Sequence, residues 1–194
     1  IGSLLTAFFL LAPLSAVQAD ETLVRIISPA HQTFTGEFRN DDLAQELTPS
    51  GRLGQLVYVP TSRSKIWVID PALIDEVIAM TGEYKLATEA APVGSKIASD
   101  WLTQLQKVSG SNQVVALAYG NPDIALANSL APSELKMYYT FGKSQLQVAL
   151  GRIVRSEPDG GWSTGKSKLS PLLKKNYSDS RKALTRLSRA VEDP

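Results

Sequence analysis

The feature that most constrains the fold is a unit that occurs twice: an apolar run, then Asp or Asn, then Pro, then a helical pattern. The first copy, residues 66–78, has the run Ile66–Ile69 followed by Asp70-Pro71 and by apolar residues at helical spacing. The second copy, residues 115–126, has an apolar run that leads into Asn121-Pro122. Continuous apolar runs are typical of strands covered on both faces. Strands that alternate with helices favour right-handed crossovers and a parallel sheet.

The rest of the chain extends this pattern. Further strands are expected at residues 22–27 and, as a short fourth strand, at 153–154. Helices are expected over residues 41–47, 52–59, 71–80, 97–108, 122–130, 132–150 and 166–191. Four strands are too few for an eight-stranded barrel. The sequence therefore predicts an α/β domain with a parallel sheet, in the form of a partial barrel-like domain over residues 20–194 that is truncated at its C-terminal end.

Residues 1–19 have the character of a secretory signal peptide. They carry no charge, and an apolar run from Leu4 to Ala12 ends at Pro13. Small residues precede Asp20, so cleavage is expected between Ala19 and Asp20. Because the chain begins with Ile, the initiator Met and the basic start of the signal peptide are missing. An exported protein is predicted; a buried N-terminal helix and a retained membrane anchor are the alternatives.

The composition excludes several kinds of chemistry. The chain has no cysteine and one histidine, His31, which excludes Cys₄ zinc sites, iron–sulfur clusters and thiol catalysis. No cofactor and no metal are expected. The total charge is balanced, with 20 Lys and Arg against 19 Asp and Glu, and gives no support to nucleic-acid binding.

Candidate site residues follow from the position of the strand ends, where parallel α/β folds bind their ligands. Two carboxylates at one rim are the minimum for acid–base or glycosidic chemistry, so Asp70 and Asp123 are the catalytic candidates if the protein is an enzyme. The candidates for ligand binding are His31, Tyr119, Asn121, Asp159 and Trp162. Trp67 and Trp101 fall on apolar faces and are predicted to lie in the core.

A structural role competes with each catalytic assignment. Asp70 before Pro71 has the pattern of a helix N-cap followed by proline at the first helical position, and Asn121 before Pro122 repeats it. Asp123 would then sit in the first helical turn, where a negative charge is favourable. Both hypotheses for these residues stay open at this point.

Charge is distributed unevenly along the chain. Residues 1–135 have 8 basic and 14 acidic side chains, whereas residues 136–194 have 12 basic and 5 acidic ones. Lys182, Arg186 and Arg189 share one face of the predicted C-terminal helix. This face is interpreted as solvated, with contact to anionic lipid or wall polymer as an alternative.

Three segments resemble a family of uncharacterised actinobacterial envelope proteins. They are Phe38–Leu47 running into Ser50–Leu53, then Val68–Leu73, then Val114–Asp123 with its Tyr-x-Asn-Pro-Asp. Members of that family begin with a signal peptide and usually end in a membrane anchor. The resemblance implies an exported, membrane-tethered protein with a region similar to the barrels of polysaccharide deacetylases and some glycosidases. With a single histidine, the chain lacks the paired histidines of those glycosidases.

These features lead to two functional hypotheses. The first is an exported cell-envelope module without catalytic activity, which binds a glycan or an envelope protein at the strand-end rim. The second is a carbohydrate-active hydrolase that uses Asp70 and Asp123. A membrane tether through a C-terminal segment is expected from the resemblance.

Overall fold

A computed structural model describes residues 22–59 and 65–156. Four strands form a parallel sheet in the order β1-β2-β3-β4, which is also their order in the chain. They are β1 (Thr22–Ile26), β2 (Lys65–Ile69), β3 (Gln113–Ala116) and β4 (Arg155–Ser156). Sequential order with parallel pairing throughout is the arrangement of a partial barrel-like α/β domain. The α/β class and the parallel sheet predicted from the repeated unit are confirmed.

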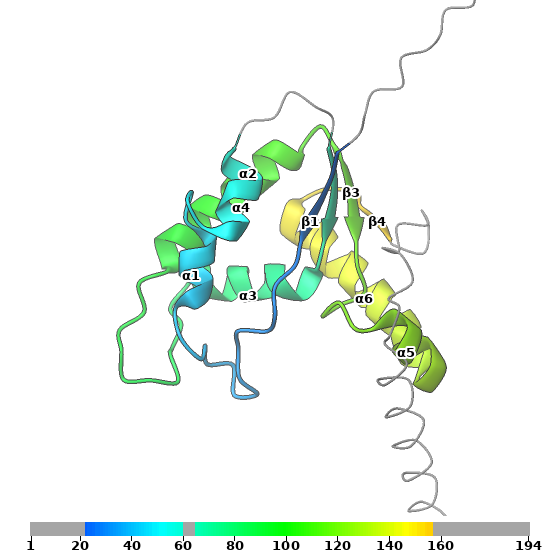
Figure 1. Ribbon diagram of the computed structural model, residues 1–194, viewed down its shortest axis with the longest axis horizontal. Coiled ribbons are helices and arrows are strands. Elements are labelled where there is room, and N and C mark those ends of the chain that lie inside the picture. Colours follow the sequence, from blue (N-terminus) through cyan, green and yellow to red (C-terminus); the bar gives the residue numbers. More distant parts are fainter. Residues whose placement is uncertain (1–21, 60–64, 157–194) are drawn as a thin grey trace, which may run out of the picture.

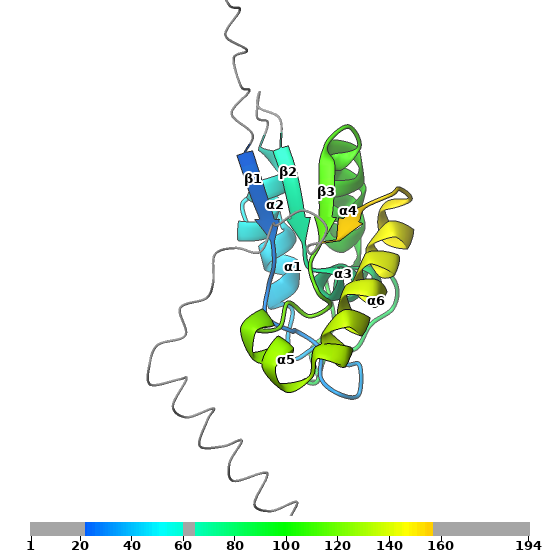
Figure 2. The same cartoon turned by 90° about the vertical axis from the view of Figure 1, so that its right-hand side faces the viewer.

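Most of the helices lie on one face of this sheet. Their bounds are α1 (Asp42–Leu47), α2 (Arg52–Tyr58), α3 (Pro71–Thr81), α4 (Ser95–Ser109), α5 (Ile124–Leu130) and α6 (Pro132–Leu150). Figure 1 shows α1 to α4 on the same side of the strands, and in the perpendicular view of Figure 2 they lie behind the sheet. Helix α6 packs on α3 and runs beside β3 and β4. Within residues 22–59 and 65–156, no helix is both long and apolar enough to cross a membrane.

The two faces of the strands carry separate apolar clusters because side chains alternate along each strand. The larger cluster lies under the helices and includes Val24, Trp67 and Ile69 from the sheet and Trp101 from α4. The smaller cluster, on the opposite face, consists of Ile66, Val68, Val115 and Leu117. Burial on both faces explains why β2 and β3 appear in the sequence as continuous apolar runs. Trp67 and Trp101 are fully buried, as predicted.

The boundaries around β3 and β4 differ from those predicted. Strand β3 ends at Ala116, and α5 begins at Ile124 with Asp123 as its N-cap, so Asn121 is not the cap. The physical reason is a backbone reversal: Gly120 and Asn121 have φ values of 75° and 44°, in the left-handed region, which a helix start does not allow. The fourth strand lies two residues later than expected, at Arg155–Ser156.

Several predicted features lie outside the described residues. They are the signal peptide with its cleavage site, Asp159, Trp162 and the basic face of the C-terminal segment.

A glycine allows α6 to reach the strand ends. A Cβ at Gly142 would lie 3.0 Å from the Leu117 carbonyl oxygen, 3.0 Å from Pro71 Cγ and 3.2 Å from the Tyr119 nitrogen. Contacts this close to backbone atoms leave no room for a side chain. The absence of a Cβ therefore allows the middle of α6 to pack against the loop that follows β3.

Candidate functional site

Asp70 lies at the end of β2 and links two elements at the rim. Its Oδ1 atom accepts the Ala72 N–H at 3.0 Å, which caps α3. The same Oδ1 atom accepts the Gly120 N–H at 3.0 Å, from the loop after β3. The side chain is 3% exposed. Asp70 is thus a buried helix cap that also fastens the neighbouring loop to the end of β2.

Burial changes the acidity of this carboxyl group. Loss of hydration raises the pKa of Asp70 to about 6, and the nearby carboxylates of Glu76 and Asp75 raise it further, against the two backbone hydrogen bonds, which lower it. A carboxyl group with a pKa near 6 is suited to general acid–base chemistry. Asp70, however, presents almost no surface to a substrate and uses its Oδ1 atom for two backbone contacts.

Asp123 is a second capping carboxylate. Its Oδ1 atom accepts the Leu126 N–H at 3.0 Å and so caps α5. Asn121 lies two residues earlier in the exposed part of the loop. Both proposed catalytic carboxylates therefore have the hydrogen bonds of helix caps.

Tyr119 follows β3 and is fixed from two sides. Its hydroxyl donates to Asp75 Oδ2 of α3 at 3.0 Å, and its backbone N–H donates to the Tyr138 carbonyl oxygen of α6 at 3.2 Å. Burial raises the pKa of Tyr119 to about 12, with a further contribution from the Asp75 hydrogen bond. Burial also raises the pKa of Asp75. The phenol is thus a fixed hydrogen-bond donor and not a source of protons near neutral pH.

Aromatic rings gather where Tyr119 meets α6. The rings of Tyr119 and Phe141 are 4.9 Å apart between centroids, at an interplanar angle of 60°. Phe141 is 46% exposed, Tyr138 43% and Met137 66%. We call Tyr119, Met137, Tyr138 and Phe141 the aromatic rim surface. An exposed apolar group of this kind, held by the part-buried Tyr119–Asp75 hydrogen bond, is typical of a binding surface.

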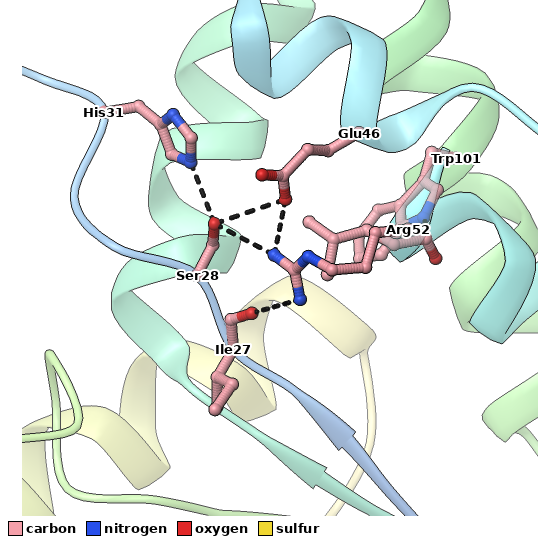
Figure 3. A network of polar contacts seen from close by, with 7 residues as sticks. Ile27, Ser28, His31, Glu46, Arg52 and Trp101 are labelled. Carbon is pink, nitrogen blue, oxygen red and sulfur yellow. Dashed lines mark hydrogen bonds and ion pairs between the residues drawn. The ribbon is translucent and has the colours of Figure 1, made fainter. Parts of the chain in front are cut away.

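The polar residues after β1 form a separate network, shown in Figure 3. Ser28 Oγ lies 3.0 Å from His31 Nε2 and 3.3 Å from Glu46 Oε2 of α1. Arg52 of α2 donates to Ser28 Oγ at 3.2 Å, forms an ion pair with Glu46, and donates to the Ile27 carbonyl oxygen at 3.0 Å. The network ties the end of β1 to α1 and α2.

A Ser–His contact of this length is also the geometry of an activated nucleophile, but the hydrogen count excludes that role. A hydroxyl has one hydrogen and two lone pairs, Arg52 only donates, and the Glu46 carboxylate only accepts. The Ser28 hydrogen therefore goes to Glu46, and one lone pair receives Arg52. His31 Nε2 must then donate to the other lone pair, so it is not a base for Ser28.

The backbone of the His31 loop is held by α3. Glu76 Oε1 accepts the N–H groups of His31 and Gln32 at 2.8 and 3.0 Å, and the Glu76 residue is only 9% exposed. Helix α3 thus supplies Asp75 to Tyr119 and Glu76 to the His31 loop, one residue apart.

The structure brings some of the predicted site residues together and separates others. Asp70 and Tyr119 meet through the loop at Gly120, whereas the His31 ring contacts Ser28. The sequence reasoning missed Asp75, Glu76, Tyr138 and Phe141. The spacing of Tyr138 and Phe141, three residues apart on a helix, was the available signal for the aromatic group.

Two further observations complete the description of the site. Among the described residues, no group of three or more His, Asp or Glu side chains is placed to hold a metal ion. Comparisons with protein-family models, curated proteins and solved structures gave no match.

Proposed function

We propose that this protein is an exported binding module without catalytic activity, and that it binds a glycan at the strand-end rim. The observation that carries the proposal is the aromatic rim surface. Tyr138 and Phe141 are exposed, and the half-buried Tyr119 ring packs against Phe141 and is held by its hydrogen bond to Asp75. Sugar rings have apolar faces that pack on aromatic rings and hydroxyl edges that need polar partners. The exposed side chain of Asn121 and the Tyr138 hydroxyl offer such partners nearby.

The roles of the two carboxylates support binding over hydrolysis. Glycosidases use a pair of carboxyl groups that flank the bond to be broken. Here Asp70 caps α3 and Asp123 caps α5, and each has a local structural reason to be an aspartate. A rim built in this way positions a ligand without a pair of free carboxyl groups.

One observation favours a carbohydrate-active hydrolase as the second candidate. Burial raises the pKa of Asp70 to about 6, in the range of a general acid. In that case the proton of Asp70 would matter, and Asp70→Asn would abolish activity in a folded protein. In a binding module, the same substitution leaves ligand binding unchanged.

Export and an envelope location belong to the same proposal. Their support is the uncharged apolar run before Asp20 and the resemblance of three segments to envelope proteins. The resemblance adds an envelope glycan or envelope protein as partner and a C-terminal membrane tether. Sequencing the N-terminus of protein recovered from an exporting host tests this part, with Asp20 as the expected first residue.

The binding proposal is tested by titrating the purified protein with soluble fragments of cell-wall glycans. We expect Phe141→Ser to weaken binding about tenfold, because one stacked ring contributes on the order of 1 kcal/mol. Val148→Ser is the matched control, since Val148 is 79% exposed on the same helix, more than two turns from Tyr138. Equal affinity of parent and Phe141→Ser for every fragment bound would refute the aromatic rim surface as the binding site.

A further inference from the structure

The aromatic rim surface has a carboxylate at its Tyr119 end. Asp75 of α3 accepts the Tyr119 hydroxyl through its Oδ2 atom at 3.0 Å, and the Tyr119 ring packs against Phe141 with 4.9 Å between the ring centroids. Both oxygens of a carboxylate accept hydrogen bonds. The Oδ1 atom of Asp75 has no hydrogen-bond partner among the described residues, and the residue is only half-buried. One carboxylate oxygen beside the ring pair is therefore left for a ligand.

A second carboxylate lies on the aromatic face of α6. Glu134 precedes Tyr138 by four residues and Phe141 by seven, and residues at these spacings share one face of a helix. Glu134 is exposed, as both rings are. The two basic residues of α6 are Lys136 and Lys143. Because successive residues turn by about 100°, both of them lie roughly 140–160° around the helix from Tyr138. The aromatic face of α6 thus has a carboxylate and neither of the two lysines.

The electrostatic environment of Tyr119 is negative. Helix α3 contains Asp75 and Glu76 and no basic residue. The pKa of Tyr119 is raised first by burial, then by the hydrogen bond to Asp75, and finally by the negative charges of Asp75, Asp70 and Glu76. No cation among the described residues opposes this shift. Aromatic rings beside carboxylates favour a cationic ligand, because a cation is attracted both to the face of a ring and to a carboxylate.

We propose that the aromatic rim surface binds preferentially a glycan whose sugar units carry free, protonated amino groups. This inference rests on the proposed glycan binding at the same surface and names the class of glycan. An ammonium group donates to Asp75 Oδ1 beside the pair of rings formed by Tyr119 and Phe141, and the apolar face of a sugar packs on the exposed ring of Phe141 or Tyr138. Glu134 is positioned for the amino group of another sugar unit. Acetylation removes the charge of an amino group, so an N-acetylated or neutral glycan lacks this attraction.

The test compares three β-linked trimers that differ in one substituent: the glucosamine trimer, the N-acetylglucosamine trimer and the glucose trimer. Their affinities are measured by calorimetric titration of the full chain at about pH 6.5, at which most free amino groups are protonated. We expect the glucosamine trimer to bind at least about fivefold more tightly than either of the other two. Added salt should weaken the binding of the glucosamine trimer and leave the affinity for the uncharged trimers unchanged.

Charge-removing variants assign the preference to particular side chains. Asp75→Asn keeps an oxygen for the Tyr119 hydroxyl and removes the charge. It should lower the affinity for the glucosamine trimer about fivefold and leave the affinity for the other two trimers unchanged, a difference that a loss of structure would not produce. The matched control is Asp100→Asn, which removes the same charge from an exposed side chain of α4 and should bind as the parent does. Glu134→Gln changes an exposed residue, so it serves if Asp75→Asn unfolds, and it too should weaken binding of the glucosamine trimer alone.

Three results would overturn the preference for amino groups. The first is an uncharged trimer that binds as tightly as the glucosamine trimer, and the second is a glucosamine trimer that does not bind. The third is full affinity for the glucosamine trimer in a variant that combines Asp75→Asn with Glu134→Gln. Glycan binding itself fails by a different result, which is equal affinity of the parent and Phe141→Ser for every cell-wall fragment bound. A protein that binds uncharged glycans through Phe141 without favouring glucosamine refutes only the preference.

Discussion

The polar groups at the ends of β1 and β2 differ both in number and in burial. After β1, Ser28, His31, Glu46 and Arg52 make several side-chain contacts, but the side chains of Arg52 and Glu46 are 51% and 29% exposed. After β2, a single side chain, Asp70, accepts two backbone N–H groups at 3% exposure. When an exposed ion pair is lost, water replaces its hydrogen bonds, whereas a buried group that loses its partner finds no such replacement. The single buried carboxylate should therefore govern stability more than the larger network.

The largest expected effect concerns pH and Asp70. The pKa of its carboxyl group is raised to about 6 from 3.8, so between these values the folded protein holds a proton that the unfolded chain releases. The free energy of unfolding therefore rises as pH falls from 7 to 4, by about 2–3 kcal/mol from this group alone. Urea unfolding of the parent and of Asp70→Asn between pH 4 and pH 7 measures this effect. The difference between their free energies of unfolding should change with pH by this amount. A constant difference would show that Asp70 titrates as an exposed carboxyl group does.

The next effect separates the hydrogen bonds of Asp70 from its charge. Asp70→Asn keeps an oxygen for the Ala72 and Gly120 N–H groups, and Asp70→Ala removes it. We expect the asparagine variant to be more stable than the alanine variant by about 2 kcal/mol at pH 7. Asp123→Ala removes the acceptor of the Leu126 N–H, whereas Asp123→Asn keeps it. These two variants should differ in stability by about 1 kcal/mol. Equal stability of the two Asp70 variants would contradict the bridging role.

The smallest effect is expected in the network after β1. Arg52→Ala removes the contacts to Ser28, Glu46 and Ile27, yet all of them lie at the surface. We expect a loss of less than about 1 kcal/mol, which added salt reduces further. Thermal unfolding at low and high ionic strength checks this. If Arg52→Ala lost as much stability as removal of the Asp70 carboxylate oxygen does, burial would not be what separates the two groups.

The fold was readable from the sequence because its strands are buried on both faces. The runs at residues 66–69 and 114–118 report that burial directly, and Asp70-Pro71 marks the start of α3. The start of α5 was predicted too early because Asn121-Pro122 has the same pattern as Asp70-Pro71. The left-handed backbone at Gly120 and Asn121 leaves no local sequence signal strong enough to override that pattern.

The site was only partly readable. The sequence placed Asp70 and Tyr119 at one rim, since the ends of adjacent parallel strands meet there. It could not show that the carboxylate of Asp70 reaches the Gly120 N–H, 50 residues later in the chain, or that Asp75 holds the Tyr119 hydroxyl. Phe141 joins the site only through the packing of α6 at Gly142, which local patterns do not encode.

In the proposed binding module, the rim carboxylates are structural and the rim binds its ligand through aromatic rings. The most direct measurement is glycan affinity and glycan hydrolysis in the parent, Asp70→Asn and Phe141→Ser, with folding checked in each. We expect no hydrolysis in any of the three, affinity within about twofold of the parent for Asp70→Asn, and a roughly tenfold loss of affinity for Phe141→Ser. A parent that cleaves a glycan and a folded Asp70→Asn that does not would contradict it.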